Sequence, residues 1–241
     1  MENNTTFNIE FKNVQVRNHT DFKLKNVSLN LTPGCYALCS YSGGGKSLIR
    51  RVIAGIVKPT FGTINLNNIS YKDICWTSQG EHLPHHLTVS EYLEVICMLK
   101  WQKKDRKQKV NSIAKKLDIS NKILKTKTKE LSVFNTRKCI LASKLILEPK
   151  VFISDELYGS MPYEKGSKLV KLTKAYVEEN NLIWLDSTHL TCDILTMDKI
   201  LYIEDGYIHD DSSDEFKKWL YAESNLLQCL KTKNYEHILF T

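Results

Sequence analysis

The chain has 241 residues, of which 25% are charged and 42% hydrophobic, and its formal net charge is +7. This length allows one or two domains with a sizeable core, and the composition is that of an ordinary soluble globular protein. No apolar run reaches the length of a membrane-spanning helix, and the polar N-terminus lacks a signal-peptide core. We therefore expect a cytoplasmic protein that meets a membrane only by docking on its cytosolic face.

The cysteines and histidines do not indicate a metal site. Seven cysteines are present, no Cys-x-x-Cys occurs, and most of them lie in apolar runs. Such cysteines are expected to be small buried side chains in a reducing compartment. His82, His85 and His86 have no partner cluster and are expected to lie in a loop.

The positive charge is concentrated in residues 100–116, which hold eight Lys or Arg side chains against one Asp. We favour a solvated helix face; contact with anionic lipid head groups or with nucleic acid are the alternatives. Trp101 is the one aromatic residue of this stretch, whereas nucleic-acid surfaces usually interleave several. We therefore expect no nucleic-acid partner.

The N-terminal part of the chain predicts antiparallel strands. Residues 7–16 and 22–31 alternate between apolar and polar side chains, which is the pattern of half-buried strands, and residues 32–34 form a turn. The apolar run 36–39 predicts a further strand. A turn at residues 59–62 leads into another strand at residues 63–67.

A glycine-rich loop follows the strand at residues 36–39. Its sequence is Ser42-Gly43-Gly44-Gly45-Lys46-Ser47, and the apolar start of a helix comes next. Glycines let backbone N–H groups close around a phosphate chain, and the helix N-terminus adds partial positive charge. In such a P-loop the lysine reaches the terminal phosphates and the serine hydroxyl binds magnesium. The residues expected to bind a nucleoside triphosphate are Ser40, Tyr41, Ser42, Gly43, Gly44, Gly45, Lys46, Ser47 and Leu48.

This loop departs from the usual pattern at two positions. Ser40 stands where the pattern has its first glycine, and serine tolerates a positive φ angle less well than glycine does. Leu48 stands where a second hydroxyl usually follows the magnesium-binding serine. A chance glycine-rich sequence in a flexible loop is the alternative interpretation, and the flanking strand and helix count against it.

Helical spacing replaces the strand pattern from residue 88 to about residue 147, so we expect a helical insertion there. The α/β pattern then returns, with a strand at 151–154, a helix at 163–179 and a strand at 182–185. A strand at 200–203 ends in an Asp205-Gly206 hairpin turn, and residues 213–230 predict an amphipathic helix.

Two carboxylates follow the buried strand at 151–154 directly, namely Asp155 and Glu156. Ligands of open parallel sheets bind at the carboxyl ends of the strands. One carboxylate there can hold magnesium, and a second can orient an attacking water for phosphoryl transfer. An isolated Asp-Glu pair is a poor signal, but one that follows a buried strand downstream of a P-loop is much better evidence.

Five motifs in order make residues 7–212 resemble the nucleotide-binding subunit of an ABC transporter. Residues 40–47 resemble the Walker A loop, and residues 74–79 resemble the Q-loop, with Gln79 as its glutamine. Residues 87–93 match the Leu-Thr-Val-x-Glu-x-Leu entry to the helical subdomain. Residues 151–156 resemble the Walker B strand with its catalytic glutamate, and residues 187–189 resemble the switch histidine, here His189.

The resemblance implies a P-loop NTPase of the α/β class with the ABC-ATPase fold. Its core with an antiparallel β subdomain would span residues 7–84 and 148–212, its helical subdomain residues 85–147, and a C-terminal helix and tail residues 213–241. The resemblance implies ATP and Mg²⁺ as cofactors. It also implies catalytic roles for Glu156, His189 and Gln79, and Mg²⁺ binding by Ser47, Gln79 and Asp155.

The implied partners are transmembrane permease subunits and a second ATP-binding subunit. Residues 79–92 would face the permease. The motifs that serve the partner's ATP depart from the family: Leu131-Ser132-Val133-Phe134-Asn135 replaces Leu-Ser-Gly-Gly-Gln, and Pro162 replaces the D-loop aspartate. Ser132 remains as the expected ATP contact, but Val133 and Phe134 are expected to crowd the partner's nucleotide.

The usual adenine-stacking aromatic residue is not evident near residues 16–20, and His19 or Phe22 are the candidates to replace it.

Three functions compete. The favoured one is an ATPase subunit that energises a separate permease. This permease is expected to be an exporter, because the sequence of residues 87–99 and the compact segment between Lys46 and Gln79 look closer to exporter-type cassettes than to amino-acid importers. The second is a degenerate cassette that binds ATP with little or no hydrolysis and pairs with a normal partner. The third, an ABC protein acting on ribosomes or DNA, normally needs two joined cassettes or a long coiled insertion, and this chain has neither.

Overall fold

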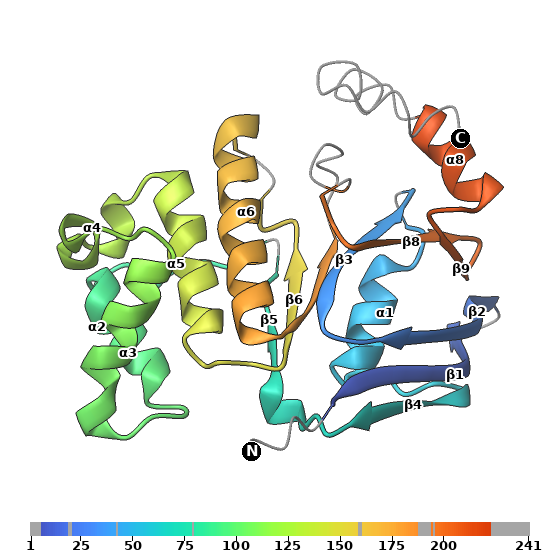
Figure 1. Cartoon of the computed structure of the whole chain (residues 1–241), viewed down its shortest axis with the longest axis horizontal. Coiled ribbons are helices and arrows are strands. Elements are labelled where there is room, and N and C mark those ends of the chain that lie inside the picture. The colour runs from blue at the N-terminus through green and yellow to red at the C-terminus, as the bar shows by residue number, and fades with distance from the viewer. Residues whose placement is uncertain are drawn as a thin grey trace. The chain divides into compact units, whose positions relative to one another are not determined.

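The computed structural model describes residues 6–18, 21–41, 43–78, 80–158, 161–187, 194 and 196–222 (Figure 1). The chain divides into two compact units, residues 1–69 with 185–241 and residues 70–184. These boundaries are not those of the expected core and helical subdomain, which stay a prediction.

The first unit contains a three-stranded antiparallel sheet in the order β2-β1-β4. Its strands are β1 (Asn8–Asn18), β2 (Asp21–Leu31) and β4 (Phe61–Asn67). The alternating residues that predicted these strands bury their apolar members, such as Ile9 and Leu24. A glycine is required at Gly62, because a Cβ there would lie 2.3 Å from the backbone oxygen of Asn13 in the irregular part of β1.

The same unit contains β3 (Gly34–Ser40), which pairs in parallel with β8 (Lys199–Glu204), and the helix α1 (Lys46–Ile53). From β7 (Ile183–Ser187), which crosses into this unit, the order of strands is β7-β3-β8-β9. The predicted hairpin turn is confirmed between β8 and β9 (Tyr207–Asp210): Asp205 and Gly206 have φ angles of 49° and 86°, as in a type I′ turn.

The helix α8 (Asp214–Ala222) packs aromatic side chains on β8: the Trp219 ring centroid lies 5.4 Å from that of Tyr202. The predicted helix at residues 213–230 is confirmed up to Ala222, and the remainder lies outside the described residues.

The second unit contains parallel strands and the predicted helices. β5 (Ile74–Trp76) pairs with β6 (Val151–Asp155), and β6 lies beside β7. The helices α2 (Val89–Cys97), α3 (Lys103–Lys116), α4 (Asn121–Lys125) and α5 (Val133–Leu145) form the helical group coloured green to yellow-green in Figure 1. The long helix α6 (Tyr163–Asn180) follows β6, and two 3₁₀ turns, η1 (Tyr71–Asp73) and η2 (Thr128–Glu130), complete the unit.

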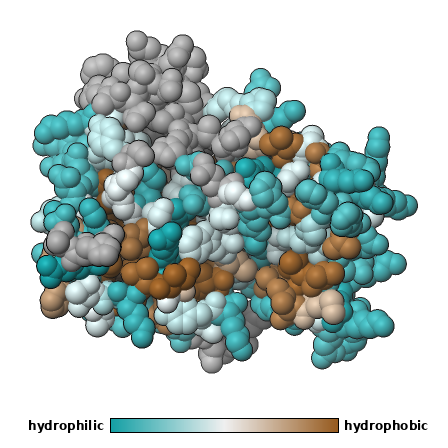
Figure 2. Space-filling model, turned by 180° about the vertical axis from the view of Figure 1, so that it is seen from behind, coloured by the Kyte–Doolittle hydropathy of each residue, from teal (hydrophilic) through white to brown (hydrophobic). Residues whose placement is uncertain are grey.

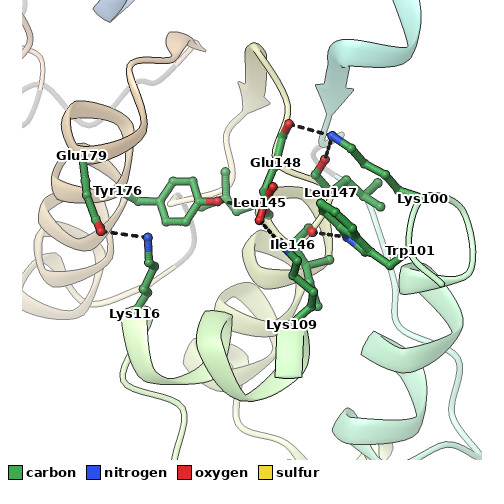
Figure 3. A network of polar contacts seen from close by, with 10 residues as sticks. All are labelled: Lys100, Trp101, Lys109, Lys116, Leu145, Ile146, Leu147, Glu148, Tyr176 and Glu179. Carbon is green, nitrogen blue, oxygen red and sulfur yellow. Dashed lines mark hydrogen bonds and ion pairs between the residues drawn. The ribbon is translucent and has the colours of Figure 1, made fainter. Parts of the chain in front are cut away.

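Part of the basic stretch is used within the second unit (Figure 3). Lys100 Nζ donates hydrogen bonds to the carbonyl oxygens of Leu147 at 2.7 Å and Glu148 at 3.1 Å, just beyond the end of α5. Cations are favourable at a helix C-terminus, where carbonyl groups have no partners within the helix. Lys109 and Lys116 on α3 pair with Glu148 and Glu179 at 2.5 and 3.0 Å. These lysines therefore stabilise the unit, while Lys103, Lys104 and Lys107 are exposed.

The surface seen in Figure 2 is mostly hydrophilic and is interrupted by hydrophobic patches. The large hydrophobic side chains with high exposure include Ile56, Val95, Met98 and Leu99. Among the described residues, no helix combines the length and the apolar character needed to cross a membrane.

Candidate nucleotide-binding site

The glycine loop joins β3 to α1 in the first unit. Gly43 and Gly45 have φ angles of 81° and 109°, the left-handed conformation that glycine adopts at no steric cost. Ser40 is the last residue of β3, lies outside that region and is buried. The prediction that Ser40 would be strained by a positive φ angle is therefore wrong, because Ser40 has strand conformation.

Ser40 instead occupies the space beside the loop. Lys46 Nζ donates hydrogen bonds to the backbone oxygen and to Oγ of Ser40, at 3.1 and 2.9 Å. Ser40 Oγ in turn donates to the backbone oxygen of Tyr41 at 2.7 Å. A Cβ built on Gly44 would lie 2.6 Å from the Cβ of Ser40, so this position accepts only glycine while Ser40 is present.

The Ser47 hydroxyl, predicted to bind magnesium, accepts a hydrogen bond from Arg50 Nη2 at 2.8 Å. The Arg50 side chain is buried, with 2% of its surface exposed. This hydrogen bond uses one lone pair of the hydroxyl oxygen and leaves a second, so Mg²⁺ binding by Ser47 stays a prediction. Arg50 is not among the predicted site residues; the available signal was its i, i+3 spacing from Ser47 on the same helix face.

A cavity of about 470 Å³ lies over the loop within the first unit. This volume lies in the range of small-molecule sites. Positively charged side chains line it, as an anionic ligand requires. The lining residues are Val16, Arg17, Lys23, Gly43, Gly44, Gly45, Lys46, Ser47, Leu48, Arg51 and Val57. The predicted ligand residues from Gly43 to Leu48 are thus brought together, whereas Ser42 lies outside the described residues.

A larger cavity of about 790 Å³ adjoins the same loop and includes Tyr41, whose side chain is 47% exposed. Phe22, one candidate for adenine stacking, lines this cavity, and the Arg17 guanidinium lies 5.7 Å from the centre of its ring. Arg17 also lines the cavity over the loop. The other candidate, His19, lies outside the described residues.

The predicted acidic pair lies in the second unit. Asp155 ends β6, Glu156 follows it, and both are half-buried. Glu156 has a φ angle of 50°, a left-handed conformation that non-glycine residues adopt uncommonly and that concentrates at functional sites. Gln79 and His189 lie outside the described residues, so the catalytic set as a whole stays a prediction.

The altered signature lies at the start of α5. Ser132 is the N-cap of this helix, and its Oγ accepts a hydrogen bond from the backbone N–H of Asn135 at 3.4 Å. Val133 is the first helical residue and is 56% exposed. Phe134 lies under the buried Lys138, whose Nζ is 5.0 Å from the ring centre and whose pKa burial lowers. A branched apolar side chain therefore projects where the family has glycine.

The comparisons with known proteins identify the family. The ABC transporter family model matches residues 24–158, more than half of the chain. The chain therefore belongs to the ABC transporter family, as an ATP-binding subunit of the ATPase class.

Two relatives illustrate the range of sequence similarity. The ABC transporter ATP-binding protein MJ0796 from Methanocaldococcus jannaschii is 25% identical over 205 residues, 78% of this chain and 87% of that protein. The energy-coupling factor transporter ATP-binding protein EcfA1 from Mycoplasma mobile is 24% identical over 219 residues, 85% of this chain and 80% of that protein.

Two solved structures share the fold. The dimeric MJ0796 cassette bound to ADP and Pi is 23% identical, has a TM-score of 0.71, and matches 83% of this chain and 96% of that one. The cbiO1 protein of Clostridium perfringens, part of the transporter complex cbiONQ, is 20% identical, has a TM-score of 0.77, and matches 97% of this chain and 98% of that one. The predicted ABC-ATPase fold is confirmed.

Proposed function

We propose that this chain binds ATP at the glycine loop and hydrolyses it to drive a separate transmembrane permease. The observation that carries the proposal is the cavity of about 470 Å³ over residues 43–48, into which Lys46 and three further cationic residues face. Backbone N–H groups and cations around a helix N-terminus form a binding site for a triphosphate chain.

The proposed chemistry assigns one task to each group. Lys46 gives up its hydrogen bonds to Ser40 and binds the terminal phosphates instead, and Glu156 orients the attacking water. Asp155 provides a carboxylate for Mg²⁺, and Gln79 and His189 complete the set as predicted from the motifs. When bound, Mg²⁺ neutralises charge on the phosphate oxygens.

The proposed partners are permease subunits in the membrane, met through residues 79–92 on the cytosolic face, and a second ATP-binding subunit. The proposed direction of transport is export, because the sequence of residues 87–99 resembles that of exporter-type cassettes. Transport assays in vesicles of known orientation would decide the direction, because an exporter and an importer move substrate in opposite senses upon addition of ATP to the cytosolic face.

A second candidate function is supported by the start of α5. The exposed Val133 covers the helix end that would approach the partner's nucleotide, and the Ser132 hydroxyl is engaged as a cap. We propose on this ground that the chain pairs with a different cassette that has a normal signature. If the chain's own site also hydrolyses little or no ATP, the chain is a regulatory cassette that binds ATP.

The test measures ATP binding and hydrolysis by the complex purified through a tag on this chain. Lys46→Ala should abolish binding at this site, and Glu156→Gln should keep binding while lowering turnover by about a hundredfold or more. Glu164→Gln, an exposed carboxylate at the start of α6, is the matched control and should change neither.

Binding with the same slow turnover before and after Glu156→Gln would favour the regulatory function. Absence of ATP binding by the unmodified complex would overturn both candidates.

A further inference from the structure

The turn from α2 into α3 exposes hydrophobic side chains beside the basic stretch. Met98 and Leu99 directly follow α2 and are 60% and 75% exposed. Val95, one turn earlier on the same side of the helix, is also exposed. Single exposed hydrophobic side chains are common, but three that lie together keep apolar surface in water that a partner could cover.

The chain's own hydrogen bonds hold this turn in place (Figure 3). Lys100 Nζ donates to the carbonyl oxygen of Leu147 at 2.7 Å, and Trp101 Nε1 donates to that of Ile146 at 2.9 Å. The tryptophan is thus tied to the body of the unit, while Leu99, two residues before it, is exposed. A surface that is ordered before binding loses little conformational entropy when a partner covers it.

Positive charge surrounds the exposed hydrophobic side chains. Residues 98–107 contain five Lys or Arg side chains and one acidic residue, Asp105. Lys103 and Lys104 are the first two residues of α3, and both are exposed. A helix N-terminus carries partial positive charge, so cations in the first turn are unfavourable in the free protein. Lys107 lies on the same face as Lys104 one turn later and adds to a positive potential that an anionic partner would neutralise.

We propose that residues 98–107 bind the surface of a membrane that contains anionic lipids. Met98 and Leu99 enter the boundary between head groups and acyl chains, and the lysines contact the head groups. Nucleic acid would need exposed aromatic faces for its bases, whereas Lys109 Nζ already covers the ring of Trp101, 3.8 Å from its centre. This contact goes beyond the proposed function, because it requires neither ATP nor the permease.

The experiment sediments the full chain with vesicles of phosphatidylcholine alone and with vesicles that also contain about one third phosphatidylserine. The unmodified chain should bind the anionic vesicles at least about tenfold more tightly. The triple variant Lys103→Gln, Lys104→Gln and Lys107→Gln should lose about tenfold or more of this affinity. The double variant Met98→Ser and Leu99→Ser keeps the charge and should lose at least about fivefold, because the apolar insertion is removed.

Matched controls change the same side chains elsewhere on the surface. Lys122→Gln, Lys125→Gln and Lys129→Gln together remove three exposed lysines from the same unit and lower the net charge equally. Ile56→Ser removes a side chain that is 64% exposed in the other unit. Each control should change vesicle affinity by less than about threefold. ATP binding should be unchanged in every variant, which separates this test from that of the proposed function.

Equal binding of the unmodified chain to both kinds of vesicle, or binding to neither, would overturn the inference and leave the proposed function intact. Equal losses in the two lysine variants would overturn it as well, because overall charge would then explain the binding. An RNA oligonucleotide that binds through Lys103, Lys104 and Lys107 while anionic vesicles do not bind would assign this surface to nucleic acid instead.

Discussion

At the scale of single residues, Gly44 and Lys46 of the glycine loop accommodate Ser40, which stands where the usual pattern has glycine. Ser40 takes up space that Gly44 leaves, and Lys46 donates to both polar oxygens of Ser40. The position of Ser40 and the absence of a side chain at Gly44 therefore depend on each other.

This dependence predicts the outcome of a double-mutant cycle. Gly44→Ala should lower nucleotide affinity by about tenfold or more, because its Cβ would lie 2.6 Å from that of Ser40 and the loop must move. The double variant Ser40→Gly and Gly44→Ala should recover most of the loss, since the nearest remaining atom, the backbone oxygen of Tyr41, is 3.0 Å away. Calorimetric titration with ATP measures all four proteins. Equal losses in the single and the double variant would show that Ser40 does not set the requirement for glycine.

At the scale of elements, the helical group of the second unit depends on its caps. Thr88 and Glu91 form a capping box at the start of α2: Thr88 N–H donates to Glu91 Oε2 at 2.7 Å, and Glu91 N–H donates to Thr88 Oγ1 at 3.3 Å. Lys100 and Trp101 donate to the carbonyl oxygens of Leu147 and Ile146, just beyond the end of α5. Both sets of contacts satisfy backbone groups that a helix leaves without partners.

The capping box predicts a dependence of stability on pH. The hydrogen bond from the Thr88 backbone N–H holds the pKa of Glu91 below its usual value, and the Thr88 hydroxyl adds to this. A carboxyl group whose pKa is depressed in the folded state stabilises the fold above its unfolded pKa, and this contribution is lost as the pH falls through the folded value. Thermal unfolding between about pH 7 and pH 3 should therefore show a smaller acid-induced loss for Glu91→Gln than for the unmodified chain.

The control for this measurement is Glu94→Gln, which removes a carboxylate from the same helix outside the box. Its acid-induced loss should match that of the unmodified chain. If both glutamine variants behave alike, the box does not carry the effect.

A buried hydroxyl between α5 and α6 gives a second prediction. Tyr176 Oη donates to the Leu145 carbonyl oxygen at 2.9 Å, and burial raises the pKa of this tyrosine (Figure 3). Tyr176→Phe leaves a buried carbonyl without this donor, so we expect a loss of about 1–3 kcal/mol in the free energy of unfolding. Tyr71→Phe, on a side chain that is 58% exposed, should cost less than about 0.5 kcal/mol. Urea unfolding compares the two, and equal losses would contradict the role assigned to Tyr176.

The sequence predicted elements that short-range patterns determine. Alternation in β1 and β2 and the Asp205-Gly206 turn were enough for the antiparallel strands and the β8–β9 hairpin. Short-range patterns could not predict the strand conformation of Ser40 or the burial of Arg50, because both depend on contacts across the folded loop. The five ordered motifs led to the family, but the arrangement of Glu156 relative to the glycine loop depends on the two units together and stays a prediction.

At the scale of the whole molecule, the proposed second ATP-binding subunit could be a copy of this chain or a different cassette. The MJ0796 cassette, which shares the fold, is dimeric in its structure bound to ADP and Pi. The residues that would bind ATP within the chain are mostly kept, whereas the start of α5, which would serve a partner, carries Val133 and Phe134 in place of glycines. This asymmetry favours a heterodimer with a cassette that has a normal signature.

The asymmetry predicts the behaviour of the isolated chain in light scattering. Glu156→Gln should prevent turnover and hold any ATP-dependent dimer together, yet the purified variant should stay monomeric in MgATP, because Val133 projects from the surface that must close on the nucleotide. Adding Val133→Gly and Phe134→Gly to Glu156→Gln removes both bulky side chains and should allow a dimer that forms with MgATP. Lys46→Ala in the same background should abolish that dimer and so shows that bound nucleotide holds it. A dimer of the single variant Glu156→Gln would mean that the altered signature still closes on ATP, and a symmetric homodimeric transporter would then be the better assignment.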